Sequence, residues 1–121
     1  MGNVIKLPLV VSTAPRQVRG KIFGLDVGGS NGALTVSGDI ISAVASIPSA
    51  NQSAVDVTFA TSAFTTPIIQ FAIESAGNGN NDNDLEEPVF ENLTGTTVRF
   101  FFHETISNVQ NLNIHLVVTE Q

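Results

Sequence analysis

Two adjacent residues, His103 and Glu104, match the first half of the HExxH motif with which zinc proteases hold their metal. The motif needs a second histidine one helical turn later, and Ser107 stands at that position. The phenylalanines at 100–102 also favour a strand over the helix that the motif requires. The sequence therefore predicts no zinc-protease site here.

Other patterns that support catalysis are incomplete. The glycine-rich segment 24–32 fits neither a phosphate-binding loop nor a dinucleotide-binding turn, and there is no GxSxG nucleophile motif. The adjacent acids Glu86 and Glu87 precede Pro88, where a pair of carboxylates is usually solvated. The chain has no cysteine, which excludes disulfides and thiolate metal ligands. We expect that the protein is not an enzyme and needs no cofactor.

One segment, 78–84, is rich in the oxygen ligands that calcium prefers, and its candidate ligands are Asn80, Asp82 and Asp84. It departs from the EF-hand pattern, since it lacks the required glycine and has no flanking helices. We expect a solvated hairpin tip, with a calcium site or a subunit contact as the alternatives.

Three outward-facing residues are candidates for an oligomer contact. If 98–104 and 112–118 form a hairpin centred on residue 109, His103 and His115 face each other on the side opposite the main apolar residues. Such a pair could lie at an oligomer contact or bind a metal across subunits, and the alternative is two unrelated surface residues. Phe101 alternates with Val98, Phe100 and Phe102, so a monomer would expose it.

These side chains must be positioned by short runs in which apolar and polar residues alternate, separated by Gly, Asn and Pro. The clearest alternation runs through 55–59, 69–73, 98–103 and 112–118, and Ile40–Ile47 could be a strand or a helical turn. Seven to nine short strands with frequent turns predict an all-β fold, an antiparallel β-sandwich of the jelly-roll or immunoglobulin-like kind.

Charge divides the chain into two parts. Four of the five basic residues fall within 1–21, which contains no acid, whereas 22–121 carries one arginine and all eleven carboxylates. We predict an extended attachment arm over 1–21, followed by a sandwich domain over 22–121. The arm would lie on the acidic surface of a neighbouring subunit, and the alternative is an ordinary first strand. Its candidate partner-binding residues are Lys6, Arg16, Arg19 and Lys21.

The same charge pattern and the hydropathy exclude two classes of partner. An acidic body argues against nucleic acid, because phosphate binding requires a cationic face. No apolar run approaches the length that spans a bilayer, so we expect no membrane insertion.

Several segments together resemble the β-sandwich modules of bacteriophage virion proteins, including the H-type-lectin-like domains of tail fibres. The matching pattern of strand and turn residues covers Ile47-Pro48, Val55–Phe59, Phe64–Ile69, Glu91–Thr94, Val98–Phe102 and Asn113–Val118. A second, turn-rich match covers Gly29–Asp39. The lectin-like members commonly carry a tryptophan near their end, and this chain has none.

The resemblance implies a noncatalytic structural protein of the virion that forms homo-oligomers, with a trimer favoured. Its partners would be tail proteins or the major capsid protein, with a host surface glycan as a further ligand. We expect a tail-fibre or receptor-binding knob, and the alternative is a capsid decoration (cement) protein. A carbohydrate-binding module is a second alternative, in which phenylalanine would have to supply the stacking surface.

Overall fold

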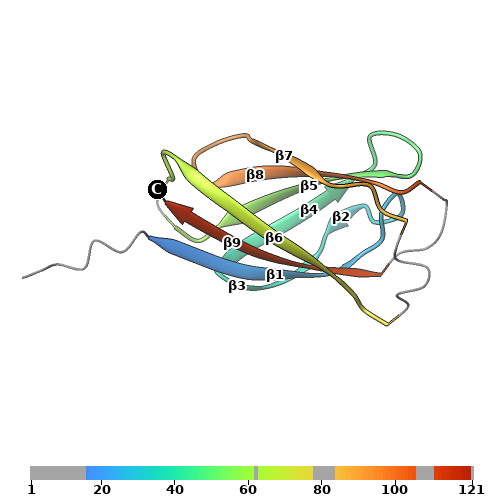
Figure 1. Cartoon of the computed structure of the whole chain (residues 1–121), viewed down its shortest axis with the longest axis horizontal. Helices are drawn as coiled ribbons and strands as arrows, with labels where there is room; N and C mark the ends of the chain where they lie inside the picture. The colour runs from blue at the N-terminus through green and yellow to red at the C-terminus, as the bar shows by residue number, and fades with distance from the viewer. Residues whose placement is uncertain (1–15, 62, 78–83, 106–110, 121) are drawn as a thin grey trace, which may run out of the picture.

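The computed structural model describes residues 16–61, 63–77, 84–105 and 111–120. These residues form two antiparallel sheets packed face to face, which confirms the predicted all-β sandwich (Figure 1). No helix within the described ranges is long and apolar enough to span a membrane. The strands are β1 (Gln17–Leu25), β2 (Gly32–Ala33), β3 (Thr35–Gly38), β4 (Ile40–Ser46), β5 (Gln52–Phe59), β6 (Pro67–Ser75), β7 (Val89–Asn92), β8 (Thr97–His103) and β9 (Leu112–Glu120).

The strands divide into a four-stranded sheet A and a five-stranded sheet B. Sheet A has the order β3-β1-β9-β6, and sheet B has the order β2-β4-β5-β8-β7. Side chains alternate between the interior and solvent along most of the strands, so one face of each sheet builds the core. The largest fully buried side chains are Phe59, Phe100, Ile22, Leu25, Leu112, Ile114 and Leu116.

β1 corrects the predicted boundary between the arm and the body, because the strand begins at Gln17 and pairs with both β3 and β9. Val18 and Ile22 are buried in the core, and the charged Arg19 and Lys21 alternate with them on the outer face. Charges at every second position mark a strand with one solvated face. The alternative of an ordinary first strand therefore holds for residues 17–21.

One side of the sandwich is covered by a continuous segment of chain, and we call it the closed side. Residues 32–33 lie in sheet B, residues 35–38 lie in sheet A, and the chain re-enters sheet B at Ile40. Gly38 has a φ of 72°, and a Cβ there would lie 2.6 Å from the carbonyl oxygen of Arg19. Glycine is therefore required at this turn.

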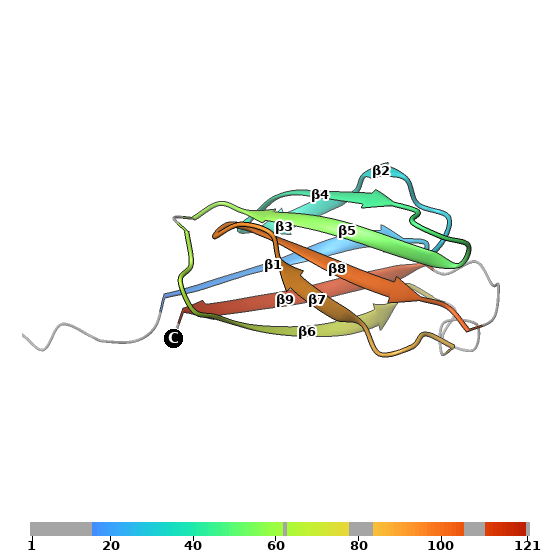
Figure 2. The same ribbon diagram turned by 90° about the horizontal axis from the view of Figure 1, so that it is seen from above.

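The other side, which we call the open side, is bounded by the edge strands β6 and β7 (Figure 2). The inward residues Ile69, Phe71 and Ile73 of β6 are only half-buried, whereas those of the adjacent β9 are buried. Phe90 of β7 is 41% exposed, although its ring centroid lies 5.9 Å from that of the buried Phe100. The two sheets thus leave part of their apolar surface uncovered here.

The two ends of the sandwich also differ. β1 begins and β9 ends at one end, beside the segments 63–66 and 93–96, and we call this end the N-terminal pole (Figure 1). At the opposite end, the distal pole, the described segments 26–31, 47–51, 84–88 and 104–105 come together. Arg16, the first described residue, therefore lies at the pole opposite these four segments.

Candidate partner-binding surfaces

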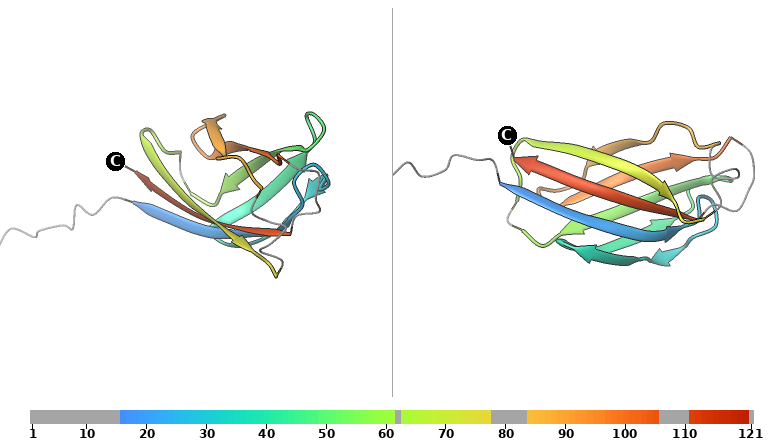
Figure 3. Two further views of the ribbon diagram at one scale, coloured as in Figure 1. Left: turned by 45° about the vertical axis from the view of Figure 1, so that its right-hand side comes forward. Right: turned by 60° about the horizontal axis from the view of Figure 1, so that its bottom comes forward.

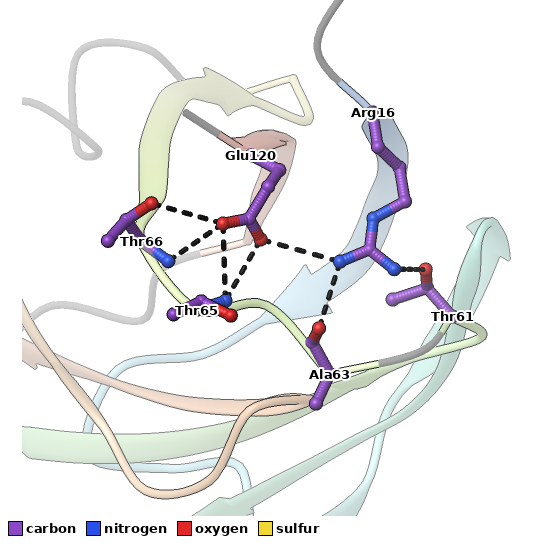
Figure 4. Close-up of polar contacts among 6 residues, drawn as sticks. All are labelled: Arg16, Thr61, Ala63, Thr65, Thr66 and Glu120. Atoms are coloured by element: carbon purple, nitrogen blue, oxygen red, sulfur yellow. Dashed lines mark hydrogen bonds and ion pairs between the residues drawn. The ribbon is translucent and has the colours of Figure 1, made fainter.

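The start of β1 is fixed at the N-terminal pole by Arg16 (Figure 4). Its guanidinium donates to the carbonyl oxygen of Ala63 at 2.9 Å and to Thr61 Oγ1 at 3.3 Å. It also pairs with Glu120 at 3.4 Å and lies over the Phe64 ring, 4.3 Å from the centroid. One side chain thereby connects the first strand, the last strand and the β5–β6 loop, and we call this group of contacts the clamp.

Glu120 completes the clamp from the last strand. Its carboxylate accepts hydrogen bonds from the backbone N–H of Thr66 at 2.8 Å and of Thr65 at 2.9 Å, and from Thr66 Oγ1 at 3.1 Å. The backbone donors of Thr66 and Thr65 lower the pKa of Glu120, with a smaller contribution from Arg16. The carboxylate therefore stays ionised at neutral pH and holds the loop against β9.

An ion cluster lies on the outer face of sheet A, which Figure 3 (right) shows in front. Glu74 accepts from Lys21 Nζ at 3.0 Å and from Asn113 Nδ2 at 3.0 Å, and it lies 3.3 Å from His115 Nε2. Hydrogen bonds from Asn113, Lys21 and His115 lower the pKa of Glu74 to about 2. The cluster ties the edge strand β6 to β9 and β1 across the sheet.

The residues predicted to form the attachment arm are distributed over different parts of the molecule. Arg16 lies in the clamp and Lys21 lies in the ion cluster. Arg19 is exposed on β1, two residues before Lys21, and its guanidinium donates to the Gln17 side chain. Lys6 lies outside the described residues. The structure therefore brings Arg19 and Lys21 together on one face, and it gives Arg16 a separate role at the pole.

Phe101 lies on the outer face of sheet B, as its alternation with the buried Phe100 and Phe102 predicted. Its cross-strand neighbours are Ala54 on β5 and Val89 on β7. Ala54 points outward but is only 6% exposed, whereas Val89 is 61% exposed. This face carries a small apolar strip of these three residues, and the subunit contact of Phe101 stays a prediction.

An ion pair crosses the same face two residues further along β5 and β8. Arg99 donates to both carboxylate oxygens of Asp56, at 2.6 and 3.0 Å, and Glu91 is its partner on β7. Asp56 raises the pKa of Arg99 above its ordinary value. The only arginine beyond residue 21 is thus engaged within its own sheet.

The two histidines do not face each other, and the predicted hairpin is wrong. β8 pairs with β5 and β7 in sheet B, whereas β9 pairs with β1 and β6 in sheet A. His103 lies 3.0 Å from Glu86, and His115 lies 3.3 Å from Glu74, on opposite outer faces. Each strand buries a full apolar face against the other sheet, so the chain crosses between the sheets and does not fold back in one.

The candidate calcium residues are only partly described. Asn80 and Asp82 lie outside the described residues, and Asp84 lies at the distal pole. Its carbonyl oxygen accepts from the backbone N–H of Thr105 at 2.9 Å and from Thr105 Oγ1 at 2.7 Å. Within the described part of the chain, no three His, Asp or Glu side chains are grouped in a way that could hold a metal ion.

Sequence reasoning missed Glu120 and the pairing of Asp56 with Arg99. Glu120 is separated from Arg16 by 104 positions, and no local pattern links the two residues. Asp56 and Arg99 could have been paired, because each lies at the centre of a strongly alternating segment with its side chain outward. The missing information was that β5 and β8 are neighbours in the sheet.

The chain was also compared with known proteins. No protein-family model matches the sequence, and the searches of curated proteins and of solved structures give no match either. We therefore infer the function from the surfaces described above.

Proposed function

We propose that the protein is a noncatalytic structural module of a bacteriophage virion, held in the particle through its N-terminal segment. We favour a tail-fibre or receptor-binding knob. The observation that carries the proposal is the opposition of the two poles: residues 1–15 precede the clamp at one pole, and four described connecting segments, 26–31, 47–51, 84–88 and 104–105, come together at the other. A module that is anchored at one end and recognises a partner at the other requires this arrangement.

The clamp supports the anchoring role for a mechanical reason. A load applied through the N-terminal segment reaches the fold first at Arg16, whose contacts distribute it to the β5–β6 loop and to Glu120. Beyond the clamp, β1 lies between two hydrogen-bonded neighbours, β3 and β9. Separating β1 from the sandwich would therefore break two strand pairings together.

The sequence also limits the kind of ligand that the distal pole could recognise. The chain contains no tryptophan or tyrosine, so a sugar-stacking platform would have to use phenylalanine. Phe101, two residues before the distal end of β8, is half-buried between Ala54 and Val89 and offers only part of its ring. We therefore favour a virion protein over a carbohydrate-binding module.

Immunogold labelling of purified phage particles with an antibody against this chain tests the proposal. Label at the tail tip is the expected result, and label over the head would favour the decoration protein. Particles that carry no label, together with binding of the purified protein to a glycan array, would overturn the virion assignment.

A further inference from the structure

The open side presents a strand edge with space beside it for one more strand. β6 is nine residues long and pairs along its full length with β9, and among the described strands no partner occupies its other edge. A long edge with free backbone donors and acceptors is a template for pairing with another chain. The half-buried Ile69, Phe71 and Ile73 along it would gain cover from an added strand.

The apolar surface at this edge continues onto β7 and ends in a groove. Phe90 and Leu93 are 41% and 40% exposed, and Phe90 and Phe71 both pack against the buried Phe100. At the N-terminal pole a groove of about 200 Å³ opens between the start of β6 and the end of β7, lined in part by Pro67 and Leu93. We call the surface from this groove along β6 and β7 the open seam.

The N-terminal segment has the sequence pattern of a strand that would fit this surface. Ile5, Leu7, Leu9 and Val11 fall on one face of an extended chain, which is the alternation of a strand with one buried side. Pro8 falls on the opposite face. Because proline donates no backbone hydrogen bond, it is tolerated in a strand that has one unpaired edge.

Charge also favours this pairing. Residues 1–15 carry one lysine and no acid, whereas residues 67–92, which include β6 and β7, carry six carboxylates and no Lys or Arg. With Ile5, Leu7 and Leu9 turned inward, Lys6 lies on the outer face, the same face that displays Glu74 of β6. Opposite charges on neighbouring strands stabilise their pairing.

We propose that Ile5–Val11 of one copy adds as a strand to the free edge of β6 in a second copy and covers the open seam. This is strand addition, in which main-chain hydrogen bonds give affinity and alternate side chains fill the apolar surface. The donor segment and the acceptor edge are different surfaces, so a one-way contact is heterologous, and it forms a ring when the rotation between copies closes. The neighbouring subunit on which the proposed attachment segment lies is then a second copy of this chain, a step that rests on the proposed function.

The length of chain available favours exchange between copies. Within one copy, residues 12–15 would have to pass the ends of β9 and β6, a lateral distance of about 14 Å for three strand spacings. Fully extended, these residues reach about 17 Å, which leaves almost no chain for the reversal of direction into an antiparallel strand. A segment donated by a neighbour has no such restriction.

Disulfide trapping tests the geometry, because the natural chain has no cysteine. Lys6→Cys protein is mixed with a differently tagged Gln70→Cys, Ala72→Cys or Glu74→Cys protein, three outward positions on β6 opposite which Lys6 leaves most of Ile5–Val11 paired along the strand. We expect one or two of these mixtures to form a disulfide between the two tagged chains. Val44→Cys, on the outer face of sheet B and 45% exposed, is the matched control and should not react.

Two outcomes of the trapping experiment would overturn the proposal. One is reaction with the three β6 positions no faster than with Val44→Cys. The other is a purely intrachain disulfide in the Lys6→Cys/Gln70→Cys and Lys6→Cys/Ala72→Cys double variants, which would mean that the segment folds back on its own copy.

Two substitutions at adjacent positions test whether alternate residues of Ile5–Val11 face the open seam. Leu9→Asp places a charge against the open seam, whereas Val10→Asp places the same charge on the outer face. In sedimentation-equilibrium measurements we expect Leu9→Asp to weaken self-association by about tenfold or more and Val10→Asp to have a much smaller effect. Equal effects, or a wild-type chain that stays monomeric, would contradict the proposal. Virions without antibody label would refute the proposed function and leave these results unchanged.

Discussion

The closed and open sides of the sandwich bury their apolar residues by different means. On the closed side the chain crosses from sheet B to sheet A and back within residues 32–46, and Ile40 is 5% exposed. The open side is bounded by the edge strands β6 and β7 (Figure 3, left). There Phe71 is half-buried and Phe90 is 41% exposed. The same fold thus completes its core with its own chain on one side only, which suits assembly from several copies.

The largest expected effect is a difference in stability between two truncations, in which removing the smaller side chain destabilises the fold more than removing the larger one. Ile40→Ala should lower the free energy of unfolding by about 2–5 kcal/mol, because it leaves a cavity under the closed side. Phe90→Ala removes a larger side chain but should cost less than about 2 kcal/mol, because much of the ring is already in water. Urea unfolding of dilute protein measures both values.

Raising the protein concentration sharpens this comparison. If copies cover the open seam, the cost of Phe90→Ala should grow as the protein assembles, whereas the cost of Ile40→Ala should stay constant. A Phe90→Ala variant that is as destabilised as Ile40→Ala when dilute would show that the open side is fully packed within one copy.

The next effect tests whether the outer face of sheet B forms a second contact between copies in addition to the open seam. Phe101→Ser should weaken self-association more than it perturbs secondary structure, because Phe101 projects from the sheet between Ala54 and Val89. Analytical ultracentrifugation and circular dichroism give the two readouts. A variant that assembles normally would leave the open seam as the contact to be tested, and loss of strand content would indicate an intramolecular role for the ring.

The sequence identified most strands but not their neighbours. Alternation at Val98, Phe100 and Phe102 correctly predicted the buried face of β8, since period-2 patterns report which face meets the core. The same alternation at Val18 and Ile22 was overlooked because the charge difference suggested a separate arm. Whether two strands share a sheet depends on long-range packing, which local patterns do not contain, and this is why the histidine hairpin was wrong.

A smaller effect concerns how the free edge strand is held. The pKa of Glu74 falls from 4.5 in the unfolded chain to about 2 in the fold, so its ion cluster stabilises the fold above about pH 4.5. That stabilisation should be lost as the pH falls from 4.5 toward 2. Glu74→Gln should flatten this part of the stability curve, measured by urea unfolding at each pH. Glu87→Gln, an exposed glutamate before β7, is the control, and an equal flattening there would contradict the assignment to Glu74.

The smallest expected effect is that of calcium on the connection that joins β6 to β7 around the open side. A cation bound only by the folded protein would raise the melting temperature by mass action, so millimolar calcium against a chelator is a direct test. We expect no shift, because the candidate segment has no closing bidentate glutamate at a defined spacing, which calcium loops use to complete their coordination. A rise that disappears in the Asp82→Asn/Asp84→Asn variant would establish a metal site. It would also mean that the open side, like the closed one, is fastened by its own connection, and that a second copy is not needed to fix the positions of its two edge strands.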